Sequence, residues 1–340
     1  MSVDLSRLVD LVETFPRQTV LVLGDFVADE YVYAEISRVS REAPVLILRH
    51  RQTDLVPGGG GNAVCNLAAL GAKVLLVGVV GDDAAGAALL ACFRQRGVNT
   101  SGVIRARGWT TPTKTRFLAG WTHTARQQVL RVDREASAPL SRRVRAAVTA
   151  RARAASRRAA AILVSDYGCG AVSPAALRGL RGKLITLDSR YSLLDYRACG
   201  ITAATPNEAE VEALFHSRIG NDRQKLESLG ARLLRAMSLQ SLVLTRGKEG
   251  MAVFERGRRP QHLPVRGGDQ AVDVTGAGDT VIAVFTLALA AGAKPLEAAE
   301  LANYAGGVVV MKRGTATVSR EELLAAIRRD ATGGSSGPST

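Results

Sequence analysis

Cysteine and histidine are scarce in this chain of 340 residues, which contains four of each. No two cysteines form a C-x-x-C pair, so the sequence argues against a zinc site and against a disulfide framework. No apolar run approaches the roughly 18 residues that a membrane-spanning helix requires. The first residues, MSVDLSRLVDLV, lack the basic and apolar regions of a signal peptide. We therefore expect a cytoplasmic protein without a membrane partner.

Acidic residues are also under-represented, because 45 lysines and arginines face 31 aspartates and glutamates and give a net charge of +14. The densest basic run is SRRVRAAVTARARAASRR, residues 141–158. It is typical either of a nucleic-acid-binding stripe or of a solvated helix face with Val144 and Val148 turned inward. Aromatic residues make up only 4% of the chain and none lies in the run, so bases would find no stacking platform. We favour the helix and expect no nucleic-acid partner.

What the sequence does contain is a regular alternation of short apolar runs with helical patterns. This alternation is typical of an α/β fold with a doubly wound, mostly parallel sheet and helices on both faces. In such a fold, ligands bind at the carboxyl ends of the strands. The expected strands cover residues 19–24, 73–79, 161–165, 183–188, 200–204, 241–245 and 251–255, and the expected helices cover 61–70, 83–95, 174–180, 208–215, 223–237, 277–291 and 296–312.

Two stretches interrupt this alternation. Residues 30–56 and 103–132 are rich in β-branched and alternating residues and show no helical period. They predict antiparallel strands that form a small lid inserted into one domain spanning residues 1–330. The ending ATGGSSGPST, residues 331–340, predicts a disordered tail.

The segment DVTGAGDTV, residues 273–281, places a Gly-Ala-Gly turn and a carboxylate at the start of an apolar helix. The N–H groups of Gly276, Ala277 and Gly278 can form an anion site on the helix dipole. Asp279 then either caps the helix or accepts a proton from an attacking hydroxyl, as phosphoryl transfer requires.

Other nucleotide motifs do not account for this turn. The third glycine of a G-x-G-x-x-G fingerprint would fall on Val281, a Walker A loop is absent, and so is the protein-kinase signature set. An oxidoreductase that uses a nucleotide is therefore a weaker alternative than a phosphotransferase.

The order of motifs resembles that of the ribokinase-like (PfkB) carbohydrate kinases over nearly the whole chain. The motifs are LVLGDFVADEY, PGGGGNAVCNLAALG, VGVVGDDAAG, TPNEAE, LTRGKEG and DVTGAGDT. The segments SRVSREAPVLIL and VSDYGCGAVS further resemble the kinase modules of ADP-heptose synthesis. This resemblance implies phosphorylation of the C1 hydroxyl of D-glycero-β-D-manno-heptose 7-phosphate, and the alternative is a kinase for ribose, fructose phosphate or a nucleoside.

The resemblance also implies roles for individual residues, with ATP and Mg²⁺ as cofactors. Asp279 would be the general base, and residues 276–278 the anion hole. Asn207 and Glu210, three apart in PNEAE, would lie near a magnesium ion or form a capping box at a helix start. The remaining residues expected around ATP are Glu208, Ala209, Asp188, Thr245, Gly247 and Asn303.

For the sugar, the resemblance implies Asp25, Asp29 and a glycine turn. Lys114 and Arg116 alternate on one strand face and would meet the distal phosphate, or else they are ordinary edge-strand charges. The full set expected around the sugar phosphate is Asp25, Asp29, Gly58, Gly59, Asn62, Lys114, Arg116, Arg131 and Asp133.

The resemblance finally implies partners. Lid strands in this family often pair between two subunits, so we expect a homodimer through the lid. A nucleotidyltransferase module does not follow the kinase in this sequence. We therefore expect separate nucleotidyltransferase and phosphatase enzymes to act downstream.

Overall fold

A computed structural model describes residues 3–121, 126–177, 179–180, 184–191, 193–267 and 271–333. Its central sheet has the strand order β12-β11-β10-β9-β8-β7-β1-β3-β4, and all neighbours from β10 to β4 run parallel. The predicted mostly parallel, doubly wound sheet is confirmed. The strands are β1 (Thr19–Val39), β3 (Lys73–Gly81), β4 (Val103–Ala106), β7 (Ala161–Asp166), β8 (Leu184–Ser189), β9 (Ala203–Ala204), β10 (Ser241–Thr245), β11 (Met251–Glu255) and β12 (Gln261–Leu263).

Helices cover both faces of this sheet because successive side chains of a strand point to opposite faces. In β1, Val20 and Val22 belong to one buried core, and Leu21 and Leu23 belong to the other. The first core is covered by α1 (Leu5–Glu13), α2 (Gly60–Ala69), α3 (Ala84–Gln95), α8 (Ala277–Ala290), α9 (Pro295–Val309) and α10 (Arg320–Gly333). The second is covered by α4 (Arg142–Ser156), α5 (Pro174–Leu177), α6 (Glu208–Phe215) and α7 (Arg223–Ala236).

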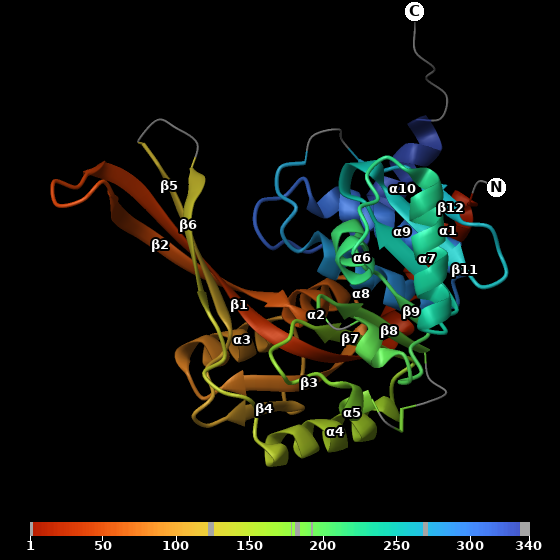
Figure 1. The fold of residues 1–340 in the computed structure, drawn as a ribbon, viewed down its shortest axis with the longest axis horizontal. Coiled ribbons are helices and arrows are strands. Elements are labelled where there is room, and N and C mark those ends of the chain that lie inside the picture. The colour runs from red at the N-terminus through yellow and green to blue at the C-terminus, as the bar shows by residue number, and fades with distance from the viewer. Residues whose placement is uncertain are drawn as a thin grey trace, which may run out of the picture.

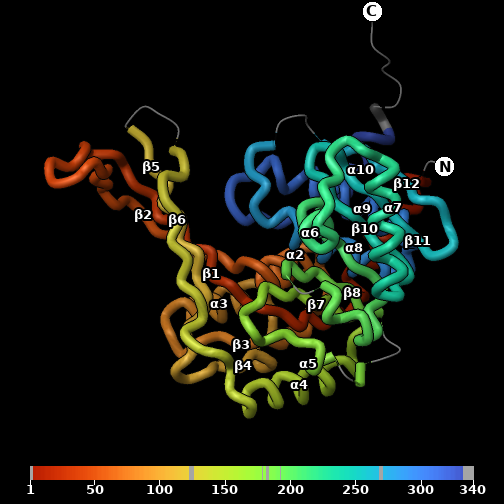
Figure 2. The backbone as a smooth tube through the Cα atoms, in the orientation of Figure 1, coloured from red at the N-terminus to blue at the C-terminus, as the bar shows by residue number. Residues whose placement is uncertain are grey.

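The lid is a second sheet that shares β1 with the first. Beyond Asp25, β1 pairs with β2 (Leu46–Gly59) on one side and with β5 (Thr113–Gly120) on the other. β6 (Gln127–Arg134) completes the lid by pairing with β5. Figures 1 and 2 show these strands projecting away from the helices of the body.

The lid differs in three respects from its prediction. The pairing of β1 with β5 is parallel, although the other two pairings are antiparallel as expected. Residues 103–106 form β4, which lies at the edge of the main sheet and outside the lid. The first strand was expected to end at residue 24, but it runs on to Val39, because residues 26–39 hydrogen-bond to β2 instead of turning back.

Two helix ends also differ from their predictions. The helix expected at 174–180 is a single turn that ends at Leu177. At the other end of the chain, α10 extends to Gly333, so the first three residues of the expected tail are helical, and residues 334–340 lie outside the described part. The basic run forms α4 as expected, with Val148 and Ala152 buried.

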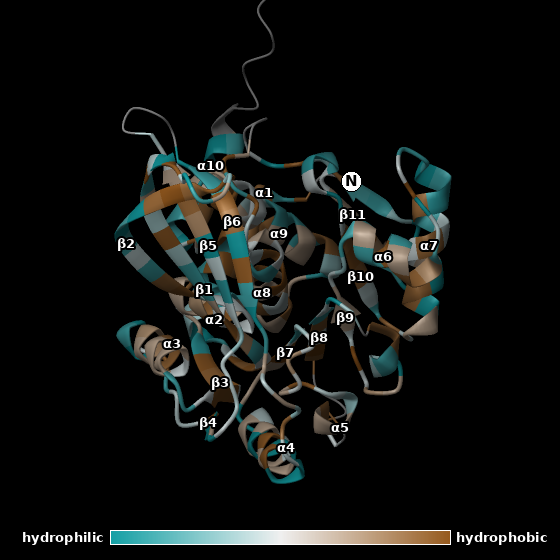
Figure 3. Cartoon of the chain, turned by 60° about the vertical axis from the view of Figure 1, so that its left-hand side comes forward, coloured by the Kyte–Doolittle hydropathy of each residue, from teal (hydrophilic) through white to brown (hydrophobic). Residues whose placement is uncertain are grey.

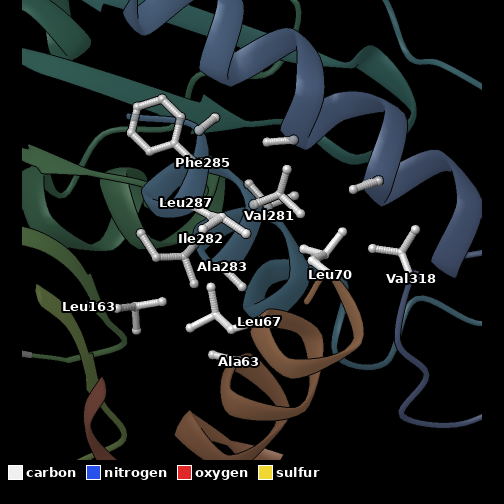
Figure 4. Packing of buried hydrophobic residues seen from close by; sticks show 14 of the residues in the cluster. Ala63, Leu67, Leu70, Leu163, Val281, Ile282, Ala283, Phe285, Leu287 and Val318 are labelled. Atoms are coloured by element: carbon white, nitrogen blue, oxygen red, sulfur yellow. The ribbon is translucent and has the colours of Figure 1, made fainter. Parts of the chain in front are cut away.

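Helix α8 is the element that positions the site. Ten consecutive residues from Asp279 to Ala288 are buried in it, as expected for a helix that is apolar on all sides. It packs against α2 and α9, and Figure 4 shows Ile282 and Ala283 close to Ala63 and Leu67 of α2. This packing fixes the amino end of α8, and with it Asp279.

Candidate active site

The carboxylate of Asp279 is buried at the amino end of α8, with 4% of the residue exposed. The hydroxyl of Tyr167 donates to its Oδ1 at 2.8 Å, and the amide of Asn62 donates to its Oδ2 at 3.3 Å. The same amide donates to the carbonyl of Gly276 at 3.0 Å. Two elements far apart in the sequence therefore hold this side chain in one orientation.

Burial raises the pKa of Asp279 to about 7, because desolvation disfavours the charged form. The hydrogen bonds from Tyr167 and Asn62 act in the opposite direction, the negative charge of Asp29 raises the pKa further, and Lys114 lowers it. A carboxylate that titrates close to neutral pH is suited to accept a proton from an alcohol.

Gly276 allows the chain to turn into α8 directly beneath Asn62. Its φ is +78°, and a Cβ atom at this position would lie 2.5 Å from Nδ2 of Asn62. Both the left-handed backbone and the close contact therefore require glycine. Of the three N–H groups predicted to form an anion hole, that of Ala277 donates to the carbonyl of Val274 at 3.2 Å. The anion hole itself remains a prediction.

Asp25 lies at the carboxyl end of the body part of β1, and its carboxylate binds a loop. Its oxygens accept the backbone N–H groups of Tyr167, Cys169 and Ala171 at 2.9 to 3.0 Å. Burial and the nearby charge of Asp166 raise its pKa to about 7. Asp25 thus holds the 167–171 loop, and its contact with a sugar remains a prediction.

Asp29, four residues further along β1, binds a different set of groups. Arg116 donates to its Oδ1 at 2.6 Å and the hydroxyl of Thr315 to its Oδ2 at 3.0 Å. A Cβ atom on Gly58 would lie 2.3 Å from this carboxylate, so β2 can approach it only with glycine there. The ion pair with Asp29 occupies Arg116, which we had expected at the distal phosphate.

A cavity of about 730 Å³, here called the lid cavity, lies between the lid and the body. Lys114, Arg131 and Asp133, which were expected at the sugar phosphate, line it, and Arg131 and Asp133 pair with each other at 2.6 Å. Arg134 and Arg190 line it as well. Within the described part of the chain, Lys114, Arg134 and Arg190 form no ion pair with a side chain.

A second cavity of about 420 Å³, here called the α8 cavity, lies at the amino end of α8, where Ala277 and Gly278 line it. Its lining is largely apolar, with glycines at the amino end of α8 and along α9. A Cβ atom on Gly278 would meet nothing within 4 Å, so protein packing does not require this glycine, and the space beside it is free. Five residues predicted to surround the nucleotide or its phosphates line this cavity: Thr245, Gly247, Ala277, Gly278 and Asn303.

Asn207 and Glu210 form the capping box at the start of α6. The side chain of Asn207 accepts the N–H of Glu210 at 2.8 Å, and Glu210 accepts the N–H of Asn207 at 2.9 Å. Glu208 pairs with Arg246 at 2.6 Å. Asn207, Glu208 and Ala209 line an open depression together with Thr245 and Gly247. Among the described residues, no group of three or more histidine, cysteine or acidic side chains could hold a metal ion.

Asp188 ends β8 near the carboxylates of Asp279 and Glu210. Burial raises its pKa well above the ordinary value, and the charges of Asp279 and Glu210 raise it further. The pKa of Glu210 is also raised, mainly by burial. Mg²⁺ needs only one or two protein carboxylates, because it keeps several waters and binds substrate phosphates. Asp188 and Glu210 therefore fit a Mg²⁺ ion even though they do not form a group of three acidic ligands with Asp279.

Sequence reasoning missed several residues of this site. Tyr167 lies in the motif VSDYGCGAVS, but no role was predicted for it. Its position directly after the buried strand β7, at the carboxyl edge of the sheet, could have indicated a site residue. Arg190 directly follows β8 in the same way. Asn62 was expected at the sugar, which remains a prediction; its contacts with Gly276 and Asp279 were not foreseen.

Comparison with known sequences identifies the family. The family model described as pfkB family carbohydrate kinase matches residues 17–322. This chain belongs to the pfkB family. Membership in this family of carbohydrate kinases decides against the oxidoreductase alternative.

Individual relatives and solved structures agree with this family. The chain is 39% identical over 324 residues to the bifunctional protein HldE of Desulfatibacillum aliphaticivorans, a match that covers 93% of this chain and 64% of that protein. It is 40% identical to HldE of Mesorhizobium japonicum, with 93% and 63% covered. The chain therefore spans slightly less than two thirds of the length of these relatives.

Solved structures with 17–19% identity share the fold. Phosphofructokinase-2 from Escherichia coli, solved with substrates and products, superposes with a TM-score of 0.74 at 17% identity, covering 92% of this chain and 98% of that one. Arabidopsis thaliana ribokinase, complexed with ribose and ATP, gives 0.72 at 19% identity, covering 92% and 99%. None of the described helices is both long enough and apolar enough to cross a membrane.

Proposed function

We propose that this pfkB-family kinase transfers the γ-phosphoryl group of ATP to the C1 hydroxyl of D-glycero-β-D-manno-heptose 7-phosphate, giving the 1,7-bisphosphate. The observation that carries the proposal is the position of Asp279. Its partner Tyr167 lines the cationic lid cavity, and its neighbour Gly278 lines the apolar α8 cavity. A base whose hydrogen-bond partner lines one cavity and whose chain neighbour lines the other is placed to act between a sugar phosphate and a nucleotide.

The transfer then requires one proton acceptor. Asp279 accepts the proton of the C1 hydroxyl, and the sugar oxygen forms a bond to the γ-phosphorus. The bond from that phosphorus to the bridging oxygen of ADP breaks, and ADP leaves with the electron pair. The amino end of α8 supplies positive potential where negative charge spreads over the phosphoryl oxygens.

The α8 cavity suits the nucleotide, because its apolar walls can cover a base while Thr245 and Gly278 leave room for phosphates. The amide of Asn303 donates to the carbonyl of Pro264 at 2.7 Å, and this bond does not use the carboxamide oxygen or the second N–H, which could contact an adenine. When bound, Mg²⁺ would neutralise negative charge on the phosphates. Asp188 and Glu210 are the acidic side chains that would hold it.

The lid cavity suits the sugar, because its cations are matched to a distal phosphate. Lys114, Arg134 and Arg190 are available, whereas Arg116 and Arg131 already bind aspartates. A phosphate with close to two negative charges gains strong hydrogen bonds from such groups. The similarity to HldE proteins supports a heptose phosphate as the particular sugar.

The test is ADP release from the purified protein over a panel of acceptors. The panel contains heptose 7-phosphate in both anomeric series, free heptose, sedoheptulose 7-phosphate, fructose 6-phosphate, ribose and adenosine. We expect the highest kcat/KM with the β-anomer of the heptose phosphate. A higher value with ribose or adenosine would refute the substrate, and equal values for heptose and its 7-phosphate would show that the cations do not read the phosphate.

We also propose that two copies of this chain pair through the lid. All eight residues of β6 are exposed, and large apolar side chains are exposed around it. Figure 3 shows hydrophobic bands along the lid strands. The exposed apolar residues in and around these strands are Val39, Val45, Leu46, Trp121, Val129, Leu130 and Val132. Monomeric proteins rarely leave so many apolar residues together in solvent.

Light scattering at several concentrations tests the pairing. We expect the mass of a dimer for the unmodified protein and that of a monomer for Leu130→Asp. Met311→Asp is the matched control, since Met311 is also an exposed apolar residue but lies outside the lid. A monomer mass for the unmodified protein at all concentrations would rule out the pairing.

A further inference from the structure

The 167–171 loop connects two carboxylates that were expected to have separate roles. It follows β7 and crosses the carboxyl edge of the sheet. Three of its backbone N–H groups bind Asp25, and the carboxylate of Asp25 is 1% exposed. Both oxygens of Asp25 are engaged, Oδ2 by Tyr167 and Cys169 and Oδ1 by Ala171. Asp25 therefore fixes the path of the loop.

The same loop places the hydroxyl of Tyr167 on Asp279. The distance of 2.8 Å is that of a good hydrogen bond from a hydroxyl to a carboxylate. Neighbours hold the ring in this place: Gly59 packs against one edge, and Nζ of Lys114 lies 5.4 Å from the ring centroid. Tyr167 thus has a fixed orientation that does not depend on a bound sugar.

We propose that Tyr167 is a positioning residue for the base Asp279, and that Asp25 acts on the reaction through Tyr167 by holding the 167–171 loop. This inference rests on the proposed function, in which Asp279 accepts the sugar proton. The hydroxyl of Tyr167 occupies Oδ1 and orients the carboxylate. Oδ2, which has only the longer contact with Asn62 at 3.3 Å, is then the oxygen that faces the acceptor hydroxyl.

The hydrogen bond from Tyr167 also stabilises the charged form of Asp279. The other titratable groups that face this carboxylate are Asp29 of β1, Lys114 of β5 and Asp188 of β8. Asp29 and Asp188 disfavour the charge of Asp279, while Lys114 and the hydroxyl favour it. Removal of the hydroxyl therefore raises the pKa of the base and requires a higher pH for activity.

The first test is Tyr167→Phe, which keeps the ring and removes the hydroxyl. We expect kcat to fall about tenfold and the acidic limb of the pH–rate profile to move upward by roughly one pH unit, since one charge-assisted hydrogen bond is lost. Tyr304→Phe is the matched control, because Tyr304 donates to Asp330 at 2.8 Å, away from Asp279. If kcat and the profile of Tyr167→Phe overlay those of the unmodified enzyme, the proposal is wrong.

The second test separates the two roles of Asp25. If Asp25 acts through Tyr167, Asp25→Asn lowers kcat, and the double variant with Tyr167→Phe is barely worse than the poorer single variant. A sugar contact, as the resemblance implied, gives a different result. Asp25→Asn would then raise KM for the sugar at nearly unchanged kcat, and its effect would multiply with that of Tyr167→Phe. That outcome would overturn the proposal.

A third measurement needs no sugar, so it distinguishes failure of this inference from failure of the proposed substrate. The carboxyl carbon of Asp279 is followed by NMR in protein labelled with ¹³C-aspartate and is identified by its loss in Asp279→Asn. We expect a higher titration midpoint in Tyr167→Phe than in the unmodified protein. An unchanged midpoint contradicts the positioning role, whereas absence of ADP release with every heptose contradicts only the substrate.

Discussion

The lid cavity, which Tyr167 lines, and the α8 cavity, which Gly278 lines, are built in different ways. The α8 cavity lies between elements of the body, and its walls are glycines and apolar side chains at the ends of core helices and strands. The lid cavity is walled by charged side chains on strands β5 and β6 and on loops. Thus the packing of the core shapes the α8 cavity, which we propose for the nucleotide, whereas strand pairing and ion pairs shape the lid cavity, which we propose for the sugar.

Because of this difference, the two cavities tolerate substitutions to different degrees before the fold is lost. The end of α8 is tied to the packing of α2 and α9, so substitutions there affect stability as well as binding. The cations of the lid cavity lie at its surface and contribute little to folding. Variation in the acceptor sugar is therefore easier to accommodate than variation in the phosphate donor.

The largest expected effect is at Asp279. Asp279→Asn keeps the size of the side chain but removes the base, and we expect kcat to fall by about 10²–10⁴. Binding of both substrates is expected to persist, measured by calorimetry with ATP and with the sugar phosphate separately. Turnover close to that of the unmodified enzyme would remove Asp279 from the mechanism and leave it as a helix cap.

The next largest effect is expected in the lid cavity, at Arg190. Arg190→Ala is expected to raise KM for the sugar phosphate by about 10- to 100-fold, the loss of one or two charge-assisted hydrogen bonds. KM for ATP and the melting temperature are expected to change little. Arg143→Ala on α4 is the control, since Arg143 is exposed and lies outside both cavities. An equal effect on free heptose and its 7-phosphate would contradict a phosphate contact.

A smaller effect is expected to distinguish Gly278 from Gly276 at the amino end of α8. Gly278→Ala meets no protein atom and should stabilise α8 slightly, by roughly 0.5–1 kcal/mol, while it raises KM for ATP several-fold by filling cavity space. Gly276→Ala should destabilise the fold by about 1–2 kcal/mol, because its φ is +78°. Melting curves of the two variants test the opposite changes in stability, and ATP titrations test the change in KM. If Gly278→Ala and Gly276→Ala changed the melting temperature equally, the two glycines would not have the different structural roles assigned here.

The last prediction concerns the dependence of stability on pH. The pKa of Asp279 is about 7 in the fold, well above the value of about 3.9 in an unfolded chain. The protonated form therefore favours folding, and this contribution is lost as the pH rises from about 4 through 7. We expect the melting temperature of Asp279→Asn, relative to the unmodified protein, to increase between pH 4 and pH 8. A constant difference would mean that Asp279 titrates normally.

Most of the body could be predicted from the sequence because its signals are local. The helix expected at 277–291 is α8, Ala277–Ala290, and the strand expected at 241–245 is β10. The lid could be predicted only in outline. The parallel pairing of β1 with β5 is a contact between residues far apart in the chain, and no local pattern encodes it.

The candidate site shows the same limit. Asp279 and the glycines beside it could be predicted from the sequence, because the motif DVTGAGDTV lies at the start of an expected helix. The role of Arg116 could not be found from its spacing, since the ion pair with Asp29 depends on the register of two strands. Tyr167 carries no local signal that it reaches a carboxylate 112 positions away. Such pairings follow from the fold, and the fold has to be known before they can be assigned.

Strand β1 has a mechanical consequence for the lid. It runs from Thr19 to Val39 without a break, so the body and the lid are joined by one continuous ribbon of hydrogen-bonded chain. Displacement of the lid relative to the body must therefore bend this strand elastically and cannot rotate it about a loop. The register with β2 shifts between Tyr33 and Ala34 and again between Ile36 and Arg38, where the ribbon is least stiff. Asp25 and Asp29 lie on the stiff side of these points, so the outer lid can flex over an acceptor while the carboxylates stay in place.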